Sequence, residues 1–522
     1  MNKKVAIFDS SLRDGAQAEG ISFSVEDKLK LLELFDEHGI GYIEAGNPGS
    51  NPKDLEFFAR AKTIQLKQAR LTAFGSTRRR DVRVEQDSNV QSLLLADTPV
   101  IAIFGKSWDF HVTDIIGTTL DENLAMIRET LAFFKARGKE VVYDAEHFFD
   151  GYKNNPDYAV RTLRAAVEGG ADTLVLCDTN GGTFPSEVAT IVAHIAGLFE
   201  TPLGIHAHND CGMAVANSVA AVENGARHVQ GTYIGFGERC GNANLSTIIA
   251  NLGVKRGYEC LPPNQYRHIT RVARHVAAIS NVALSERMPY VGSSAFAHKG
   301  GMHIDGVNKA ARSFEHIDPE QVGGQRRFLM SEVSGRRMIL DKIWEVDPAI
   351  TKDDPVTDRI MKRLKEMEHE GYQFEGAESS FELIVLKHLG KYRSFFDLVH
   401  FRIIGEQPAE GEYSASAIIK IKVDGKDEIT AAEGDGPVHA LDRALRKALE
   451  TFYPELANAH LTDYKVRVIN GKDATAAKVR VLLQSSDGDA VWTTIGVSTD
   501  IIEASWLALV DSIEYKLLKI RG

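Results

Sequence analysis

Cysteines are scarce in this sequence. Only four occur among 522 residues, and no two of them form a CxxC pair. Disulfide frameworks and zinc ribbons need cysteines in pairs at short, regular spacing. Neither kind of structure is therefore indicated.

Apolar runs are short as well. None approaches the ~18 consecutive apolar residues of a membrane span. The N-terminal segment passes Lys3 and Lys4 and reaches Asp9 before the apolar core of a signal peptide forms. We therefore expect a cytoplasmic protein that does not bind a membrane.

An excess of basic residues is also missing, since the formal net charge is -11. Binding to nucleic-acid phosphates needs clustered Lys and Arg, so no nucleic-acid partner is expected. Two basic clusters, at residues 78–80 and 326–327, are exceptions. They fit either a solvated surface or a contact for an anionic ligand, and we favour the solvated surface.

Short β-rich runs alternate with helical patterns from residue 5 to about residue 260. The candidate strands begin near Val5, Tyr42, Arg70, Val100, Glu140, Thr173, Pro202 and His228. Between them lie amphipathic segments such as residues 25–38, where Leu29, Leu32 and Phe35 share one helical face. Eight β/α units in roughly 250 residues predict an α/β fold, a (β/α)8 TIM barrel. A doubly wound open sheet is the alternative, but no Gly-rich dinucleotide fingerprint follows the first strand.

The remainder of the chain exceeds what one core of about 250–300 residues holds, so further domains are expected. We predict a barrel over residues 1–265 and a linker of helices and loops over residues 266–390. Strands with period-2 alternation then appear over residues 391–522. There a helical pattern that starts at Val438 recurs 64 residues later at Ile502. This predicts a C-terminal α+β domain made of duplicated strand-strand-strand-helix (βββα) units.

Two histidines at the end of the seventh predicted strand are candidate metal ligands. His206 and His208 are two residues apart, so both side chains face the same side of the strand. Asp14 and Asn242, at other strand ends, can supply oxygen ligands. Such a mixed N/O set suits Mg, Mn or Zn. A His-x-His pair alone is more often structural, but the four residues together favour a metal site.

Charged side chains at other strand ends are candidates for catalysis. Arg13, next to Asp14, is suited to stabilise a developing oxyanion together with a metal. Asp144 and Glu146 share a face of the fifth predicted strand, and one of them could be a general base. Glu44 and Thr179 also lie at strand ends. The carboxylates could instead form a structural ring of ion pairs.

Three motifs resemble the signatures of the DRE-TIM metallolyases. They are residues 11–17 (SLRDGAQ), 206–210 (HAHND) and 237–242 (GERCGN). The duplicated C-terminal module resembles the regulatory domain of the 2-isopropylmalate and citramalate synthases within that superfamily. Its segments 434–442 and 501–506 are similar to motifs of that domain. The resemblance extends over essentially the whole chain.

The resemblance implies a role for each matching residue. It places the metal at Asp14, His206, His208 and Asn242, and the keto acid at Arg13, Gln17, Asp144 and Thr179. It makes Glu146 and Glu238 catalytic carboxylates. His298 matches a histidine that one subunit brings to the barrel of its partner, which implies a homodimer. Phe314 stands where some relatives carry a tyrosine, so a phenolic role there is in doubt.

The resemblance also implies the reaction, a Claisen condensation of acetyl-CoA with a 2-oxo acid followed by thioester hydrolysis. Segments 107–109 and 143–151 are more similar to the synthases that use pyruvate and produce citramalate. Phe104 and Tyr143 could narrow the pocket toward pyruvate or could be ordinary barrel packing. Isoleucine is the effector expected at the C-terminal module. A 2-isopropylmalate synthase is the first alternative and a homocitrate synthase the second. A carbon–carbon lyase of the same superfamily and a non-catalytic amino-acid-binding protein are alternatives from other classes.

Overall fold

The computed structural model describes residues 3–329, 340, 343–344, 346–351, 354–406, 414–469, 477–487 and 490–521. The chain divides into two compact units, each described below by itself. The first comprises residues 1–297 and 315–327, and the second comprises residues 298–314 and 328–522. Within the described part of the chain, no helix combines the length and apolar character that a membrane span requires.

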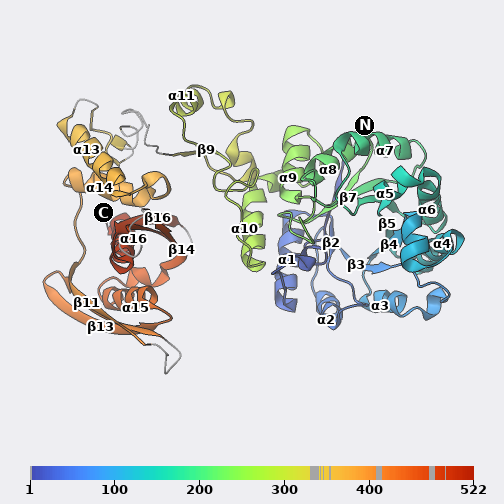
Figure 1. The fold of residues 1–522 in the computed structure, drawn as a ribbon, viewed down its shortest axis with the longest axis horizontal. Coiled ribbons are helices and arrows are strands. Elements are labelled where there is room, and N and C mark those ends of the chain that lie inside the picture. Colours follow the sequence, from blue (N-terminus) through green and yellow to red (C-terminus); the bar gives the residue numbers. More distant parts are fainter. Residues whose placement is uncertain are drawn as a thin grey trace. The chain divides into compact units, whose positions relative to one another are not determined.

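Eight parallel strands form a closed barrel in the first unit (Figure 1). They are β1 (Ala6–Asp9), β2 (Tyr42–Glu44), β3 (Arg70–Ser76), β4 (Val100–Lys106), β5 (Glu140–Glu146), β6 (Thr173–Asp178), β7 (Leu203–Ala207) and β8 (His228–Gly231). The barrel closes where β1 pairs with β8. Six strands begin at the predicted residue, and β1 and β7 begin one residue later. The predicted TIM barrel is confirmed.

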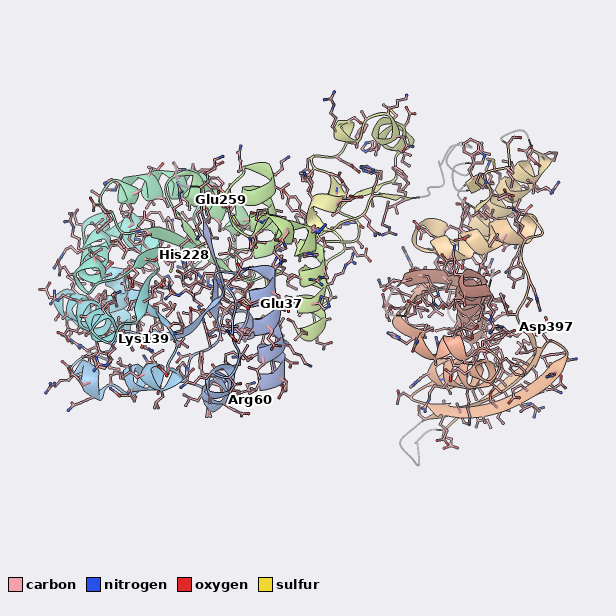
Figure 2. All side chains as sticks on the ribbon, turned by 180° about the vertical axis from the view of Figure 1, so that it is seen from behind. Glu37, Arg60, Lys139, His228, Glu259 and Asp397 are labelled. Carbon is pink, nitrogen blue, oxygen red and sulfur yellow. The ribbon has the colours of Figure 1, made fainter. Side chains whose placement is uncertain are left out.

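Helices surround the barrel (Figure 1). They are α1 (Val25–His38), α2 (Pro52–Ala61), α3 (Ser88–Ala96), α4 (Leu120–Lys135), α5 (Phe148–Asn154), α6 (Pro156–Glu168), α7 (Pro185–Ala196), α8 (Ala214–Glu223), α9 (Leu245–Ile249) and α10 (Ile269–Ile279). Charged side chains such as Glu37 and Arg60 lie on this outer layer, whereas His228 lies inside the barrel (Figure 2).

Helix α1 shows why the local sequence defines these elements. A capping box at Ser24 satisfies the first backbone N–H groups, because Ser24 and Asp27 each accept a hydrogen bond from the backbone of the other. Gly39 ends the helix in the left-handed conformation, with φ of 88°. Leu32 and Phe35 are fully buried on the face toward the barrel, while Leu29 is only half-buried. The predicted helix at residues 25–38 is confirmed.

The segment after α10 is mostly helix and loop. It contains a two-stranded sheet of β9 (Ala297–His298) and β10 (Arg327–Phe328), with α11 (Gly301–Lys309) between these strands in the sequence. The helices α13 (Pro355–Glu370) and α14 (Glu378–His388) follow β10. The compact units divide at residues 297, 314 and 327. The three-domain division at 265 and 390 therefore stays a prediction.

The C-terminal part contains two three-stranded antiparallel sheets, each followed by a helix. The first βββα repeat consists of β11 (Asp397–Gly405), β12 (Ala415–Val423), β13 (Lys426–Gly434) and α15 (Pro437–Glu450). The second repeat consists of β14 (His460–Val468), β15 (Val479–Ser486), β16 (Val491–Ser498) and α16 (Ile501–Arg521). Ile419 in β12 and Leu483 in β15 are fully buried, and both contribute to one core. The predicted duplicated βββα fold is confirmed.

Candidate active site

A pocket of about 230 Å³ opens at the carboxyl ends of the barrel strands. Its lining contains most of the residues singled out in the sequence: Arg13, Asp14, Gln17, Asp144, Glu146, Thr179, His206, His208 and Glu238. Three further residues, Phe74, Phe104 and Cys177, supply its less polar wall. The fold thus brings together side chains that lie more than 200 residues apart in the sequence, as the C-terminal face of a TIM barrel does.

Asp14, His206 and His208 form a group that can hold a metal ion, with ligand atoms within 4.8 Å of one another. His206 Nε2 lies 3.3 Å from His208 Nε2 and 3.5 Å from Asp14 Oδ2. All three side chains are buried. Among the described residues, Asp14 Oδ1 and both side-chain polar atoms of Asn242 are buried without a hydrogen-bond partner. Such unsatisfied oxygen atoms beside converging imidazoles fit a divalent cation.

The electrostatics of this group also favour a cation. Burial lowers the pKa of His206 to about 3 and lowers that of His208, so both imidazoles are neutral at neutral pH. Burial opposes ionisation of Asp14, but the positive charge of Arg13 outweighs it and holds its pKa at about 2. A neutral imidazole pair with an ionised carboxylate is the state that metal binding requires.

Arg13 is fixed by contacts on three sides. Its Nε donates to Glu44 Oε2 at 2.6 Å, and its Nη1 lies 3.3 Å from Asp14 Oδ2. The guanidinium carbon lies 3.7 Å from the centre of the Phe74 ring. Glu44, which also accepts a hydrogen bond from Ser10, does not line the pocket. Its role is therefore to orient Arg13, which places a cationic donor beside the metal group.

The two carboxylates of β5 both face the pocket but differ in their surroundings. Burial, followed by the negative charge of Glu44, raises the pKa of Asp144 to about 8, and its Oδ1 accepts a 2.8 Å hydrogen bond from Gln230 Nε2. Glu146 instead forms an ion pair with Lys106. The site thus places a carboxyl that holds its proton at neutral pH beside a carboxylate that is paired with a lysine.

Thr179 is oriented as a hydrogen-bond donor. Its Oγ1 accepts a hydrogen bond of 2.9 Å from the backbone N–H of His147, which leaves the hydroxyl proton for another partner. Arg239 Nη2 donates to the Thr179 carbonyl at 2.8 Å and also pairs with Asp210. These contacts hold the loop that carries Glu238 and Asn242 against the end of β7.

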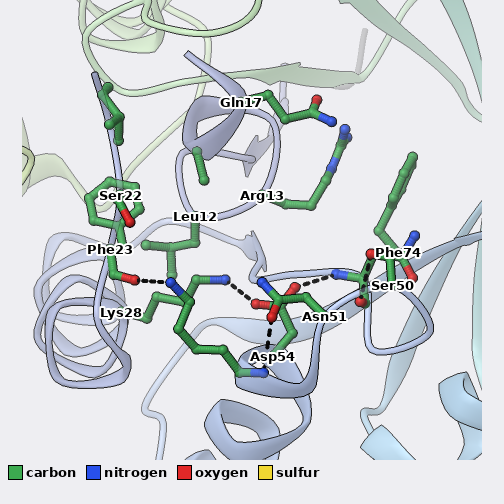
Figure 3. Close-up of a pocket in the computed structure, with 14 residues that line it drawn as sticks. Leu12, Arg13, Gln17, Ser22, Phe23, Lys28, Ser50, Asn51, Asp54 and Phe74 are labelled. Atoms are coloured by element: carbon green, nitrogen blue, oxygen red, sulfur yellow. Dashed lines mark hydrogen bonds and ion pairs between the residues drawn. The ribbon is translucent and has the colours of Figure 1, made fainter. Parts of the chain in front are cut away.

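A second pocket of about 360 Å³ adjoins the first and shares Arg13, Gln17 and Phe74 with it. It lies between the loops that follow β1 and β2 (Figure 3). Within it, Lys28 Nζ bonds Asp54 Oδ1 at 2.6 Å and Lys53 Nζ bonds the Phe23 carbonyl at 2.7 Å. The combined space exceeds what a small keto acid needs.

Of the two alternatives for Tyr143, ordinary barrel packing holds. The side chain is fully buried in the layer between barrel and helices and does not narrow the pocket, because alternate residues of a strand face opposite sides. Phe104 does line the pocket and stacks on Phe74, with ring centres 5.1 Å apart. Arg78 is not on a solvated surface; it is 5% exposed and bonds Glu122 and Glu129, each at 2.7 Å.

Other predicted residues lie outside the pocket lining. Asn242 forms a β-bridge with His208 and is buried. His298 is a buried residue of β9, and Phe314 packs on His303 with ring centres 4.1 Å apart. The sequence analysis missed Lys106 and Gln230. The period-2 alternation of side chains along β4 and β8 could have placed both residues on the inward face of their strands.

Three protein families match successive parts of the chain. The family described as HMGL-like matches residues 4–276, the homocitrate synthase post-HMGL domain-like family matches residues 290–372, and the LeuA allosteric (dimerisation) domain matches residues 375–517. The first match alone spans more than half of the 522 residues. The match to the LeuA allosteric (dimerisation) domain supports the prediction that the C-terminal domain is regulatory.

Full-length relatives are similar to the chain along nearly its whole length. An (R)-citramalate synthase of Aquifex aeolicus is 51% identical, covering 99% of both chains. An (R)-citramalate synthase of Geobacter sulfurreducens is 51% identical, covering 99% of this chain and 98% of its own. A probable 2-isopropylmalate synthase of Methanopyrus kandleri is 31% identical, covering 98% of each. Among solved structures, the hydroxymethylglutaryl-CoA lyase of Pseudomonas aeruginosa is 19% identical, with a TM-score of 0.46 over 54% of this chain and 95% of its own.

Proposed function

This chain belongs to the (R)-citramalate synthase family, and we propose that it condenses acetyl-CoA with pyruvate and hydrolyses the resulting thioester to citramalate and CoA. One observation carries the assignment. Five (R)-citramalate synthases are 44–51% identical to the chain over nearly its full length, whereas the probable 2-isopropylmalate synthase of Methanopyrus kandleri is 31% identical. The chain is accordingly an acyltransferase that converts the acyl group to alkyl on transfer.

In this proposal Asp14, His206, His208 and Asn242 hold a divalent ion, Mg or Mn in the first place and Zn in the second. When bound, the ion supplies Lewis-acid polarisation of a ketone. Arg13 donates to the pyruvate ketone oxygen and stabilises the negative charge that develops there as the new carbon–carbon bond forms. Its contacts with Glu44 and Phe74 fix it before substrate arrives, which lowers the reorganisation that the reaction requires.

The remaining pocket residues bind pyruvate. Thr179 donates its free hydroxyl proton to the carboxylate, and Gln17 contacts the substrate from the wall that both pockets share. Asp144, neutral at pH 7, donates a hydrogen bond to a substrate oxygen. The stacked rings of Phe74 and Phe104 form an apolar side of the pocket, and the pyruvate methyl group lies against them. Acetyl-CoA extends from this site into the adjoining pocket (Figure 3).

Glu146 removes the proton from the acetyl methyl group, and its ion pair with Lys106 holds the carboxylate in place. The methyl carbon then attacks the pyruvate ketone. His298, brought by the partner subunit of a homodimer, and Glu238 activate the water that hydrolyses the thioester. The exposed position of Glu238 at the pocket mouth supports access to water.

Free-thiol release from acetyl-CoA tests the function directly. With Mg or Mn present, pyruvate, 2-oxoisovalerate and 2-oxoglutarate are offered separately. We expect release with pyruvate at a kcat/KM far above that for either larger acid. Preference for 2-oxoisovalerate would assign 2-isopropylmalate synthesis instead, and no release with any acid would overturn the synthase proposal.

The C-terminal module is proposed as the sensor of an amino-acid effector, with isoleucine as that effector. The match to the LeuA allosteric (dimerisation) domain supports regulation and dimer formation. Titration of the full chain with isoleucine and leucine in a calorimeter tests the choice. Heat of binding with isoleucine alone is expected, and binding of leucine alone would contradict it. We also propose domain boundaries at residues 265 and 390, which limited proteolysis would test. A cytoplasmic location is proposed as well, and cell fractionation would test it.

A further inference from the structure

Gln230 in β8 connects a metal ligand to a pocket carboxyl, although it does not line the pocket itself. Its Oε1 lies 3.0 Å from His206 Nδ1, and its Nε2 lies 2.8 Å from Asp144 Oδ1. Gln230 is fully buried, so water does not compete for either contact. The pairing of β7 with β8 places Gln230 directly beside His206.

The direction of these two hydrogen bonds selects one form of His206. An amide oxygen only accepts, so the proton of the neutral ring must lie on Nδ1. Nε2 then carries a lone pair, and this is the atom that lies 3.3 Å from His208 Nε2 and 3.5 Å from Asp14 Oδ2. If the amide were reversed, its NH2 group would face Nδ1 and the ring proton would move to Nε2. That form could not bind a metal through Nε2.

Asp144 determines which way the amide points. Its Oδ1 accepts a hydrogen bond from Gln230 Nε2, which turns the amide oxygen toward His206. The other side of Asp144 faces the pocket. The three side chains therefore form a chain of contacts from the pocket, through a residue that touches neither substrate nor metal, to a metal ligand.

We propose that Gln230 is a positioning residue that fixes His206 in its metal-binding tautomer and at the same time holds Asp144 in its substrate-facing orientation. The inference rests on the metal site of the proposed function and extends it to a residue behind the site. Outer-shell partners of metal-bound histidines commonly set ring orientation and tautomer, and their loss costs about 10–100-fold in metal affinity or activity.

Two substitutions separate the two contacts. Gln230→Leu removes both the acceptor for His206 and the donor for Asp144. Gln230→Glu keeps an oxygen acceptor for His206 Nδ1 but removes the donor for Asp144. His228→Gln is the matched control, because His228 lies two residues earlier on β8, is equally buried, and contacts Phe8 and Tyr42 rather than a metal ligand.

The measurement is the dissociation constant of Mn²⁺ for the metal-free full-length chain, followed by KM for pyruvate. We expect Gln230→Leu to weaken Mn²⁺ binding by about 10–100-fold, whereas Gln230→Glu and His228→Gln retain it. Gln230→Glu should instead raise KM for pyruvate. Gln230→Met, of similar length, serves as the second apolar variant should the leucine variant fail to fold.

The outcomes distinguish a failure of the role proposed for Gln230 from a failure of the proposed metal site. Unchanged Mn²⁺ affinity in the apolar variants would overturn the role of Gln230 alone. If Gln230→Glu weakened Mn²⁺ binding as much as the apolar variants do, Gln230 would serve only to pack the barrel interior. That result would also overturn the proposed role. If the unmodified chain itself bound no divalent metal, the metal site of the proposed function would fail first.

Discussion

Lys106 and Glu146 occupy paired positions at the ends of β4 and β5, and their side chains form an ion pair beside the metal group. The barrel register alone places them side by side, since 39 residues separate them in the sequence. A lysine in this position restricts the rotation of the Glu146 carboxylate. A fixed orientation serves a residue that must accept a proton at a defined point.

Replacement of Glu146 by Gln tests the assignment of the base. The amide cannot accept the methyl proton, so we expect exchange of the acetyl-CoA methyl protons with deuterated water to fall by about 10²–10⁴-fold, the usual contribution of a general base. Exchange is followed by NMR. Lys106→Met should lower the exchange rate less, because the carboxylate remains present. Exchange retained in Glu146→Gln would assign the base elsewhere.

Removal of the metal tests the Asp14–His206–His208 group. Dialysis against a chelator should abolish thiol release, and addition of Mg²⁺ or Mn²⁺ should restore it. In His208→Ala we expect metal affinity to fall by more than about 100-fold, the upper end of the cost of losing an outer-shell partner. His316→Ala, an exposed histidine of the first unit, is the control. Full activity in the chelated chain would contradict a metal-dependent reaction.

Shortening Phe104 tests the choice of 2-oxo acid. Because Phe104 stacks on Phe74 in the pocket wall, Phe104→Ala should open space for the branched chain of 2-oxoisovalerate. A methyl group is worth about 1–3 kcal/mol of discrimination. The ratio of kcat/KM for 2-oxoisovalerate over pyruvate should therefore rise about 10–100-fold. Tyr143→Phe, outside the pocket, should leave this ratio unchanged, and an unchanged ratio in Phe104→Ala would place the selective contact elsewhere.

The raised pKa of Asp144 predicts a pH dependence of stability. Its pKa is about 8 in the folded chain, against 3.8 for an aspartate in water, so between these pH values the folded state binds a proton that the unfolded state has released. The contribution of this proton to the free energy of unfolding is fully present below pH 4 and is lost as the pH rises toward 8. Each pKa unit corresponds to about 1.4 kcal/mol, so the change is on the order of a few kcal/mol.

Urea unfolding of the metal-free chain at pH 5 and pH 8 measures this effect. Asp144→Asn keeps the acceptor for Gln230 but has no proton to lose. We expect the free energy of unfolding of the unmodified chain to fall relative to that of the variant as the pH rises. Parallel pH profiles for the two proteins would show that Asp144 does not carry the proton.

Much of the site was predictable because each residue ends a recognisable strand. His206 and His208 share a face of β7, and Asp14, Asp144, Glu146 and Thr179 follow or end other strands, so barrel geometry directs them to one end. The orientation of Tyr143 could not be predicted, because period-2 alternation gives a strand two faces without saying which one points into the barrel. In the structure its neighbour Asp144 lines the pocket, so Tyr143 points to the opposite face.

Local periodicity and short motifs were enough to predict the order of strands and helices, the duplicated C-terminal repeats and the set of candidate ligands. Which side chains touch one another follows only from the three-dimensional fold. The Lys106–Glu146 pair and the bridge of Gln230 between His206 and Asp144 depend on barrel closure and on the register between strands. Register fixes contacts between residues far apart in the chain, and no local pattern records it.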